Sequence, residues 1–125
     1  MATKRNPYEA YSNNAILTAS KEELTLMLFD GAVKFCNKAI IALEKKDIME
    51  THKYIMKTEA IIEEFQITLD MQYDVSKDLF NMYDYIYRRL VEANMAKDKV
   101  ILEECLGLIR ELRDTWKEAM KLAKV

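Results

Sequence analysis

A run of helix-compatible sequence from Leu17 to Ala42 constrains the fold of this chain more than any other feature. It opens on a capping box, in which Ser20 can accept a hydrogen bond from the backbone of Glu23 and Glu23 can reach back to Ser20. Two apolar seams follow, one reading Leu24, Leu28, Ala32, Phe35, Ala39, Ala42 and the other Met27, Phe29, Val33, Cys36, Ile40, Leu43. Because apolar residues cover well over half of its circumference, the sequence predicts a helix that is buried on two sides.

The composition favours an all-α fold. The chain has 125 residues but two glycines and one proline, which leaves few residues suited to the tight turns of a sheet. Its length corresponds to one domain, residues 1–125, with enough residues to bury a core. A net charge of −2 provides no basic footprint for nucleic acid or for an anionic membrane surface, so neither is expected as a partner.

We expect four helices, over about residues 20–45, 48–71, 76–94 and 98–123, in an antiparallel up-down bundle. Asp47 is the expected cap of the second helix, and Asp74 or Ser76 that of the third. Gly31 suggests close approach of a neighbouring helix. The expected core face of the second helix is Ile48, Ile55, Ile62, Phe65, Leu69, with Ile61, Ile67, Met71 beside it. That of the third helix is Leu79, Tyr83, Ile86, Leu90, Ala93. That of the fourth helix is Ile101, Cys105, Leu108, Leu112, Trp116, Ala119, Ala123, with Leu102, Leu106, Ile109, Met120 as a second edge.

Residues 1–19 allow two interpretations. The segment is polar, yet it contains four apolar or aromatic residues, Tyr8, Tyr11, Ile16 and Leu17. It is either a frayed tail or a segment that docks on the bundle.

The three tyrosines at 83, 85 and 87 also allow two interpretations, because residues two positions apart point in different directions around a helix. They are either boundary residues of the core or aromatic anchors for a partner.

Catalytic and metal-binding chemistry has little support in the sequence. His52 is the only histidine and is expected as a partly buried structural residue, so no catalytic set and no two-metal carboxylate site can be assembled. Cys36 and Cys105 lack metal-ligand spacing and are expected as reduced, buried small residues. We therefore expect no enzyme, no cofactor and no metal. With no signal sequence and no membrane segment in view, the expected location is the cytoplasm.

The apolar surface exceeds what a plain bundle needs. Both sides of the first helix, secondary edges on the second and fourth helices, the tyrosines of the third helix and eight methionines contribute to it. Such adaptable surface suits amphipathic helices of a partner, so the residues indicate a binding module with an apolar groove. A self-associating structural bundle and an enzyme or metal carrier are the alternatives from other classes.

Three motifs and a late tryptophan resemble the flagellar secretion chaperone family FliS. The motifs are NPYEAY, LTASKEELTLMLFDGAVKF and MYDYIYRRLVEAN, and Trp116 follows near the end, so the resemblance covers nearly the whole chain. Two departures are Lys21, where the family usually has proline, and the absence of a Gly-Gly after Met71. Both residue types at position 21 suit a first helical turn.

The resemblance implies a bacterial export chaperone of the cytosol. Such proteins bind the C-terminal segment of flagellin, prevent its premature polymerisation and aid its delivery to the flagellar type III export apparatus, whose gate components are further partners. The flagellin segment is disordered when free and becomes partly helical along apolar grooves. The N-terminal segment, matching Asn6 to Leu17, lies over part of that groove when flagellin is absent. The oligomeric state stays open between monomer and homodimer.

The resemblance also implies partner-binding residues. They are Tyr8, Tyr11, Ile16, Leu17, Leu24, Leu28, Tyr83, Tyr87, Arg88, Leu90 and Asn94. Asn94 can equally be a C-terminal helix cap, and the neighbouring Arg89 can pair with an acidic residue to hold the bundle together.

Overall fold

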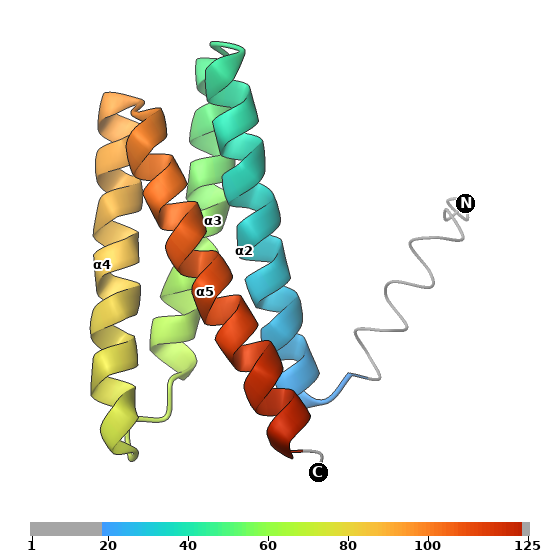
Figure 1. Cartoon of the computed structure of the whole chain (residues 1–125). Helices are drawn as coiled ribbons and strands as arrows, with labels where there is room; N and C mark the ends of the chain where they lie inside the picture. The colour runs from blue at the N-terminus through green and yellow to red at the C-terminus, as the bar shows by residue number, and fades with distance from the viewer. Residues whose placement is uncertain (1–18, 124–125) are drawn as a thin grey trace, which may run out of the picture.

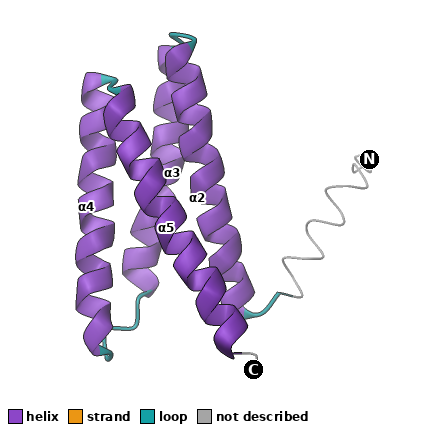
Figure 2. Ribbon diagram, viewed as in Figure 1, coloured by secondary structure: helices purple, strands orange, loops and turns teal. Residues whose placement is uncertain are grey.

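Four long helices make up the part of the chain that the computed structural model describes, residues 19–123 (Figure 1). They are α2 (Lys21–Glu44), α3 (Ile48–Thr68), α4 (Asp74–Ala96) and α5 (Lys99–Ala123). Short loops join them, and this part of the chain contains no strand (Figure 2). The helices form a ring, in which α2 contacts α3 and α5 while α4 contacts the same two from the other side. The predicted all-α, antiparallel four-helix bundle is confirmed.

The first two helix starts use the side-chain caps that the sequence predicts. The Ser20 hydroxyl accepts a hydrogen bond from the backbone N–H of Glu23 at 3.2 Å, and Asp47 accepts one from Glu50 at 3.1 Å. Each bond satisfies a backbone donor that has no partner within the first helical turn. The predicted starts of these two helices are therefore correct to within a residue.

The predicted cap of the third helix is wrong. The helix α4 starts at Asp74, and Tyr73, the residue before it, makes no side-chain cap. Ser76 lies inside the helix and is buried, where its hydroxyl donates a hydrogen bond to the backbone oxygen of Asp70 at 2.5 Å. The connection is therefore longer than predicted, because α3 ends at Thr68 rather than near residue 71.

Burial of α2 on two sides is confirmed over most of its length. Its buried side chains are Phe29, Ala32, Val33, Cys36, Ala39, Ile40 and Ala42. Three of them are small and have no exposed area, which allows α3 and α5 to approach closely. The first two turns differ, because Leu24 and Leu28 remain 37% and 36% exposed.

Gly31 faces α3, as predicted. A methyl group at this position would lie 3.4 Å from Cδ1 of Ile61, at the short end of ordinary van der Waals contact. Alanine would therefore fit with a small adjustment of the Ile61 side chain, and the close approach does not demand glycine.

The core face of α3 differs from the predicted one at both ends. Ile55, Ile62 and Phe65 are buried as expected, but Ile48 and Ile67 are more than half exposed. Two threonines take interior positions instead and have no exposed area, Thr51 and Thr58. Each hydroxyl donates to a backbone oxygen one turn earlier, at 2.6 and 2.8 Å, so neither of these hydroxyls is buried without a partner.

The predicted seam of α5 is rotated by part of a turn. The buried side chains are Leu102, Cys105, Leu106 and Ile109, most of them from the expected second edge. Ala119 and Ala123 are exposed. Figure 1 shows the reason: α5 runs obliquely from the end of α4 to the start of α2, so its last turns leave the centre of the bundle.

Trp116 links the last part of α5 to the first turn of α2. Its ring is partly buried against the core, and its Nε1–H donates a hydrogen bond to the backbone oxygen of Glu22 at 3.1 Å. The expected role in closing one end of the bundle is confirmed, although the ring lies at the edge of the core rather than inside it.

Both cysteines are free and buried, as predicted. The Cys36 thiol donates to the backbone oxygen of Leu102 at 3.6 Å. Burial raises the pKa of both thiols to about 12, so they are uncharged at neutral pH. Their role in the described fold is packing between α2 and α5.

Two lysines occupy left-handed backbone positions at helix ends. Lys46, with a φ of 60°, follows α2, and Lys97, with a φ of 51°, follows α4. After α2 the backbone N–H of Asp47 donates to the oxygen of Ala42 and that of Lys46 to the oxygen of Leu43, both at 2.9 Å. This is the Schellman motif, which glycine usually completes because a side chain strains the left-handed conformation.

We expect Lys46→Gly to raise the free energy of unfolding by about 0.5–1 kcal/mol. Glycine removes the left-handed strain, and the greater freedom of the unfolded chain offsets part of the gain. Denaturant unfolding measures the change. Lys45→Gly is the matched control, because Lys45 has a φ of −82° and gains nothing from glycine. Equal effects of the two substitutions would contradict the strain argument.

Candidate partner-binding surface

Among the large apolar side chains that remain exposed, two groups lie close together on the bundle. The first is the start of α2, with Leu24, Met27 and Leu28. The second lies along the neighbouring sides of α3 and α4, with Met56, Phe80, Tyr87 and Val91, and we call it the α3/α4 strip. Tyr87 is partly buried against the core, and the other three are between 36% and 48% exposed.

Two contacts define how α3 and α4 are aligned along the strip. Nδ1 of His52 lies 2.8 Å from the amide nitrogen of Asn94, and the rings of Phe65 and Tyr83 stack with their centroids 5.5 Å apart. The antiparallel register between these contacts sets Met56 opposite Val91. Because Phe80, Tyr87 and Val91 recur at steps of seven and four, they share one side of α4.

The three tyrosines of α4 occupy three different environments. Tyr83 is 6% exposed and stacks on Phe65, and burial raises its pKa. Tyr85 is exposed, and its hydroxyl donates to Oε1 of Glu104 at 3.1 Å. Tyr87 alone belongs to the α3/α4 strip. The prediction that at least one ring is partly exposed is confirmed.

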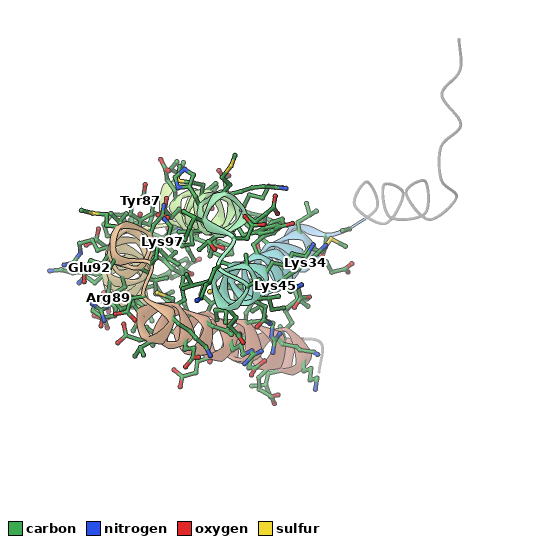
Figure 3. The ribbon with its side chains drawn as sticks, turned by 90° about the horizontal axis from the view of Figure 1, so that it is seen from above. Lys34, Lys45, Tyr87, Arg89, Glu92 and Lys97 are labelled. Atoms are coloured by element: carbon green, nitrogen blue, oxygen red, sulfur yellow. The ribbon has the colours of Figure 1, made fainter. Side chains whose placement is uncertain are left out.

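Arg89 connects α4 to α5 through a salt bridge. Its Nε lies 2.8 Å from Oε1 of Glu104 and its Nη1 lies 2.6 Å from Oε2 of Glu92. The hydrogen bond with Arg89 lowers the pKa of the Glu104 carboxyl, and the same bond raises the pKa of the guanidinium. The expectation that Arg89 pairs with an acidic neighbour is confirmed. Figure 3 shows Arg89 and Tyr87 on different sides of α4, Tyr87 on the side nearer α3.

Asn94 lies at the end of the strip and is not the cap of its helix. The helix continues to Ala96, and Lys97 takes the left-handed position after it. The Asn94 side chain instead contacts His52 of α3, and its side-chain oxygen and backbone oxygen accept from Nζ of Lys97. His52 is exposed rather than partly buried as predicted, although its contact is structural.

The described residues contain neither a cation-binding cluster nor a membrane-crossing helix. No three histidine, cysteine or acidic side chains in residues 19–123 come together as metal ligands. Within the same range, every helix is too short or too polar to span a bilayer. The surface features of this part of the chain are thus apolar and charged patches on a helical bundle.

Comparison with known proteins agrees with the fold and the motifs. The sequence profile of the family described as "Flagellar protein FliS" matches residues 4–123. The chain belongs to the FliS family. It is 41% identical to the flagellar secretion chaperone FliS of Bacillus subtilis, over 94% of this chain and 88% of that one. It is 32% identical to that of Salmonella typhimurium, over 84% and 80% of the two chains.

A solved structure supports the fold independently. The protein titled "Crystal structure of flagellar chaperone from bacteria" superimposes with a TM-score of 0.75 over 93% of this chain and 98% of that chain. Its sequence identity is 18%, so this likeness concerns the backbone arrangement alone. The helical bundle is therefore shared with a flagellar chaperone whose sequence differs at most positions.

The residues that the FliS resemblance implies as partner contacts are spread over different environments. Tyr8, Tyr11, Ile16 and Leu17 lie outside the described residues. Leu24 and Leu28 are at the exposed start of α2, and Tyr87, Arg88 and Asn94 are on or beside the strip. Arg88 is exposed and pairs with Asp84 of its own helix at 3.1 Å. Tyr83 and Leu90 are core residues, so a partner cannot reach them while the bundle stays closed.

The sequence analysis did not identify three members of the α3/α4 strip as candidate contacts: Met56, Phe80 and Val91. The signal for the two α4 residues was present, because their spacing to Tyr87 places them on one side of the helix. The sequence analysis assigned the core face of this helix and left Phe80 and Val91 without a role. Only the alignment of α3 with α4 shows that these side chains stay uncovered.

A buried carboxyl group lies next to the strip. Glu59 is 6% exposed, and the register places it opposite Tyr87. Burial raises the pKa of this carboxyl, while the nearby His52 acts in the opposite direction. A carboxyl whose pKa is raised by folding contributes fully to stability below its ordinary pKa of 4.5, where it is protonated in both the folded and the unfolded chain. This contribution is lost as the pH rises through the raised pKa of the folded state.

We therefore expect Glu59→Gln to stabilise the protein at pH 7 more than at pH 4. The amide keeps the shape of the side chain and removes the cost of burying a charge. Denaturant unfolding at the two pH values measures the effect. Glu64→Gln, at an exposed position of the same helix, is the control and should change little at either pH. A stabilisation at pH 4 as large as that at pH 7 would contradict the argument.

Proposed function

We propose that this chain is a cytoplasmic export chaperone that binds the C-terminal segment of flagellin. In this role it prevents premature polymerisation of flagellin and aids its delivery to the flagellar type III export apparatus. Membership of the FliS family supports the chaperone role, since the relatives are named flagellar secretion chaperones. The observation that most favours a helical peptide as cargo is the uncovered α3/α4 strip.

The strip has the dimensions of a docking site for a short amphipathic helix. Phe80, Tyr87 and Val91 span 11 residue steps of α4, which is about 16 Å along the helix axis. A partner helix of about three turns can lay its apolar face along this length, with anchors at positions i, i+4 and i+7. Leu24, Met27 and Leu28 offer a second, separate apolar patch for another part of a long segment.

Removal of the exposed apolar side chains from water provides a driving force for such binding. Each exposed side chain that a partner covers contributes about 25 cal/mol for every Å² of apolar surface removed from water. Ordering a disordered segment costs part of this gain, which allows a complex that is specific and still releasable. The segment 1–19, with Tyr8, Tyr11, Ile16 and Leu17, is proposed to cover part of the apolar surface when flagellin is absent.

A calorimetric titration with a peptide of the last ~50–60 residues of a flagellin from the same organism, long enough for several helical segments, tests the proposal. We expect saturable one-to-one binding with a large negative change in heat capacity, because apolar surface is buried. Absence of binding by the folded protein would overturn the proposal. Concentration-dependent sedimentation that is indifferent to the peptide would favour a self-associating scaffold instead.

Two matched variants locate the site. Val91 is 36% exposed on the strip, and Val100 is 73% exposed at the start of α5, outside it. We expect Val91→Asp to weaken binding by about tenfold or more, since it places a charge in an apolar contact. Val100→Asp should bind the peptide like the unmodified chain. Equal affinities of the two variants would show that the peptide does not use the strip.

A further inference from the structure

A cluster of lysines surrounds two stacked aromatic rings between α2 and α3. The rings of Phe35 and Tyr54 are nearly parallel, with centroids 6.1 Å apart. Nζ of Lys38 lies 5.4 Å and Nζ of Lys53 lies 5.0 Å from the centroid of Tyr54. Nζ of Lys57 lies 5.2 Å from the centroid of Phe35 and 5.8 Å from that of Tyr54. We call these five residues the basic aromatic cluster.

The positive charges of this cluster are incompletely compensated. Lys53 pairs with Glu50 at 3.6 Å. Within residues 19–123, neither Lys38 nor Lys57 has an acidic group within ion-pair distance. The ring faces attract ammonium groups, but a ring quadrupole offsets much less repulsion than a carboxylate would. Three ammonium groups gathered on two rings therefore favour the approach of anionic groups.

A surface pocket opens directly beside the cluster. Its volume is about 260 Å³, and its lining residues are Lys38, Ile41, Ala42, Lys45, Asp47, Glu50 and Tyr54. Ile41 is 51% exposed although it belongs to an otherwise buried part of α2. The pocket thus combines an apolar wall with lysines on one side and two carboxylates beside the α2–α3 turn.

The cluster and pocket are separate from the α3/α4 strip. In Figure 3, Lys34 and Lys45 of α2 lie on the side of the bundle away from Arg89 and Glu92 of α4. Lys45 belongs to the lining of the pocket, and the exposed Lys34 lies one turn before Lys38 on α2. No residue of the cluster or the pocket belongs to the strip.

We propose that the cluster and pocket bind an acidic segment of a partner protein. An apolar side chain of the segment enters the pocket against Ile41 and Tyr54, and carboxylates one to two helical turns away reach Lys38 and Lys57. Charge complementarity selects this occupant over a compact phosphate-like anion, because Asp47 and Glu50 would repel a polyanion inside the pocket. A protein segment can instead direct backbone N–H groups or a basic side chain toward these two carboxylates.

The first experiment compares two designed helical peptides by fluorescence anisotropy with the full chain. One contains Leu followed by Glu three, four and seven residues later, and the other has Gln at the three Glu positions. We expect the Glu peptide to bind at least about tenfold more tightly and to weaken as salt rises from about 50 to about 300 mM. No binding of the Glu peptide, or equal binding of both peptides, overturns the proposal. Displacement of the Glu peptide by a matched concentration of inorganic tripolyphosphate also overturns it in favour of a polyanion site.

Variants of the chain test the assignment of residues. We expect the double variant Lys38→Glu, Lys57→Glu to weaken binding of the Glu peptide by about tenfold or more, and Ile41→Ser to weaken it while leaving the salt dependence intact. Lys77→Glu changes an exposed lysine of α4 outside the cluster and is the matched control. Unchanged binding by both the double variant and Ile41→Ser would place the peptide elsewhere. All variants should retain the affinity of the unmodified chain for the flagellin peptide, so failure here leaves the proposed function untouched.

Discussion

The packing of α2 against α3 and α5 is the interaction on which the rest of the structure depends. Ala32, Cys36 and Ala39 have no exposed area and are small, so two neighbouring helices can approach the same helix from different sides. Helices packed over small side chains reach the short end of the usual range of separations, about 8 Å between axes. The fourth helix, α4, contacts α3 and α5 less extensively than α2 does. Its outer sides are therefore the natural place for uncovered apolar surface.

A few polar contacts fix how the helices are aligned. Arg89 joins α4 to α5 through Glu104, the Trp116 indole joins α5 to the start of α2, and Asn94 joins α4 to His52 of α3. Each is near the surface and contributes little to the free energy of folding. A shift of one helical turn would break all of them at once, however, because the axial rise of a turn is about 5.4 Å. They therefore specify one register of an apolar core that could otherwise slide, and this register assembles the α3/α4 strip.

Helix periodicity and capping residues predicted the fold well, but the surfaces only in part. The four helices, the caps at Ser20 and Asp47 and the burial of α2 follow from local sequence. The burial of Thr51 and Thr58 does not, because their hydroxyls find partners in their own helix only once it has formed. The oblique path of α5 rotates its core face by an amount that no single-helix pattern contains. The basic aromatic cluster could not be predicted from the sequence either, because antiparallel packing brings together Phe35 and Tyr54 from separate helices.

The helix α3 contributes to both the α3/α4 strip and the basic aromatic cluster. Met56 belongs to the α3/α4 strip, and the next residue, Lys57, belongs to the basic aromatic cluster on the side toward α2. Because the two surfaces share no residue, the proposed cargo helix and the proposed acidic segment would not compete for the same contacts. Sites without shared contacts bind independently unless a common element moves, and α3 is the shortest physical connection between them. Its central part is anchored by the fully buried Ile55 and Ile62, so a rigid α3 favours two independent sites on one chaperone rather than an exchange of one partner for the other.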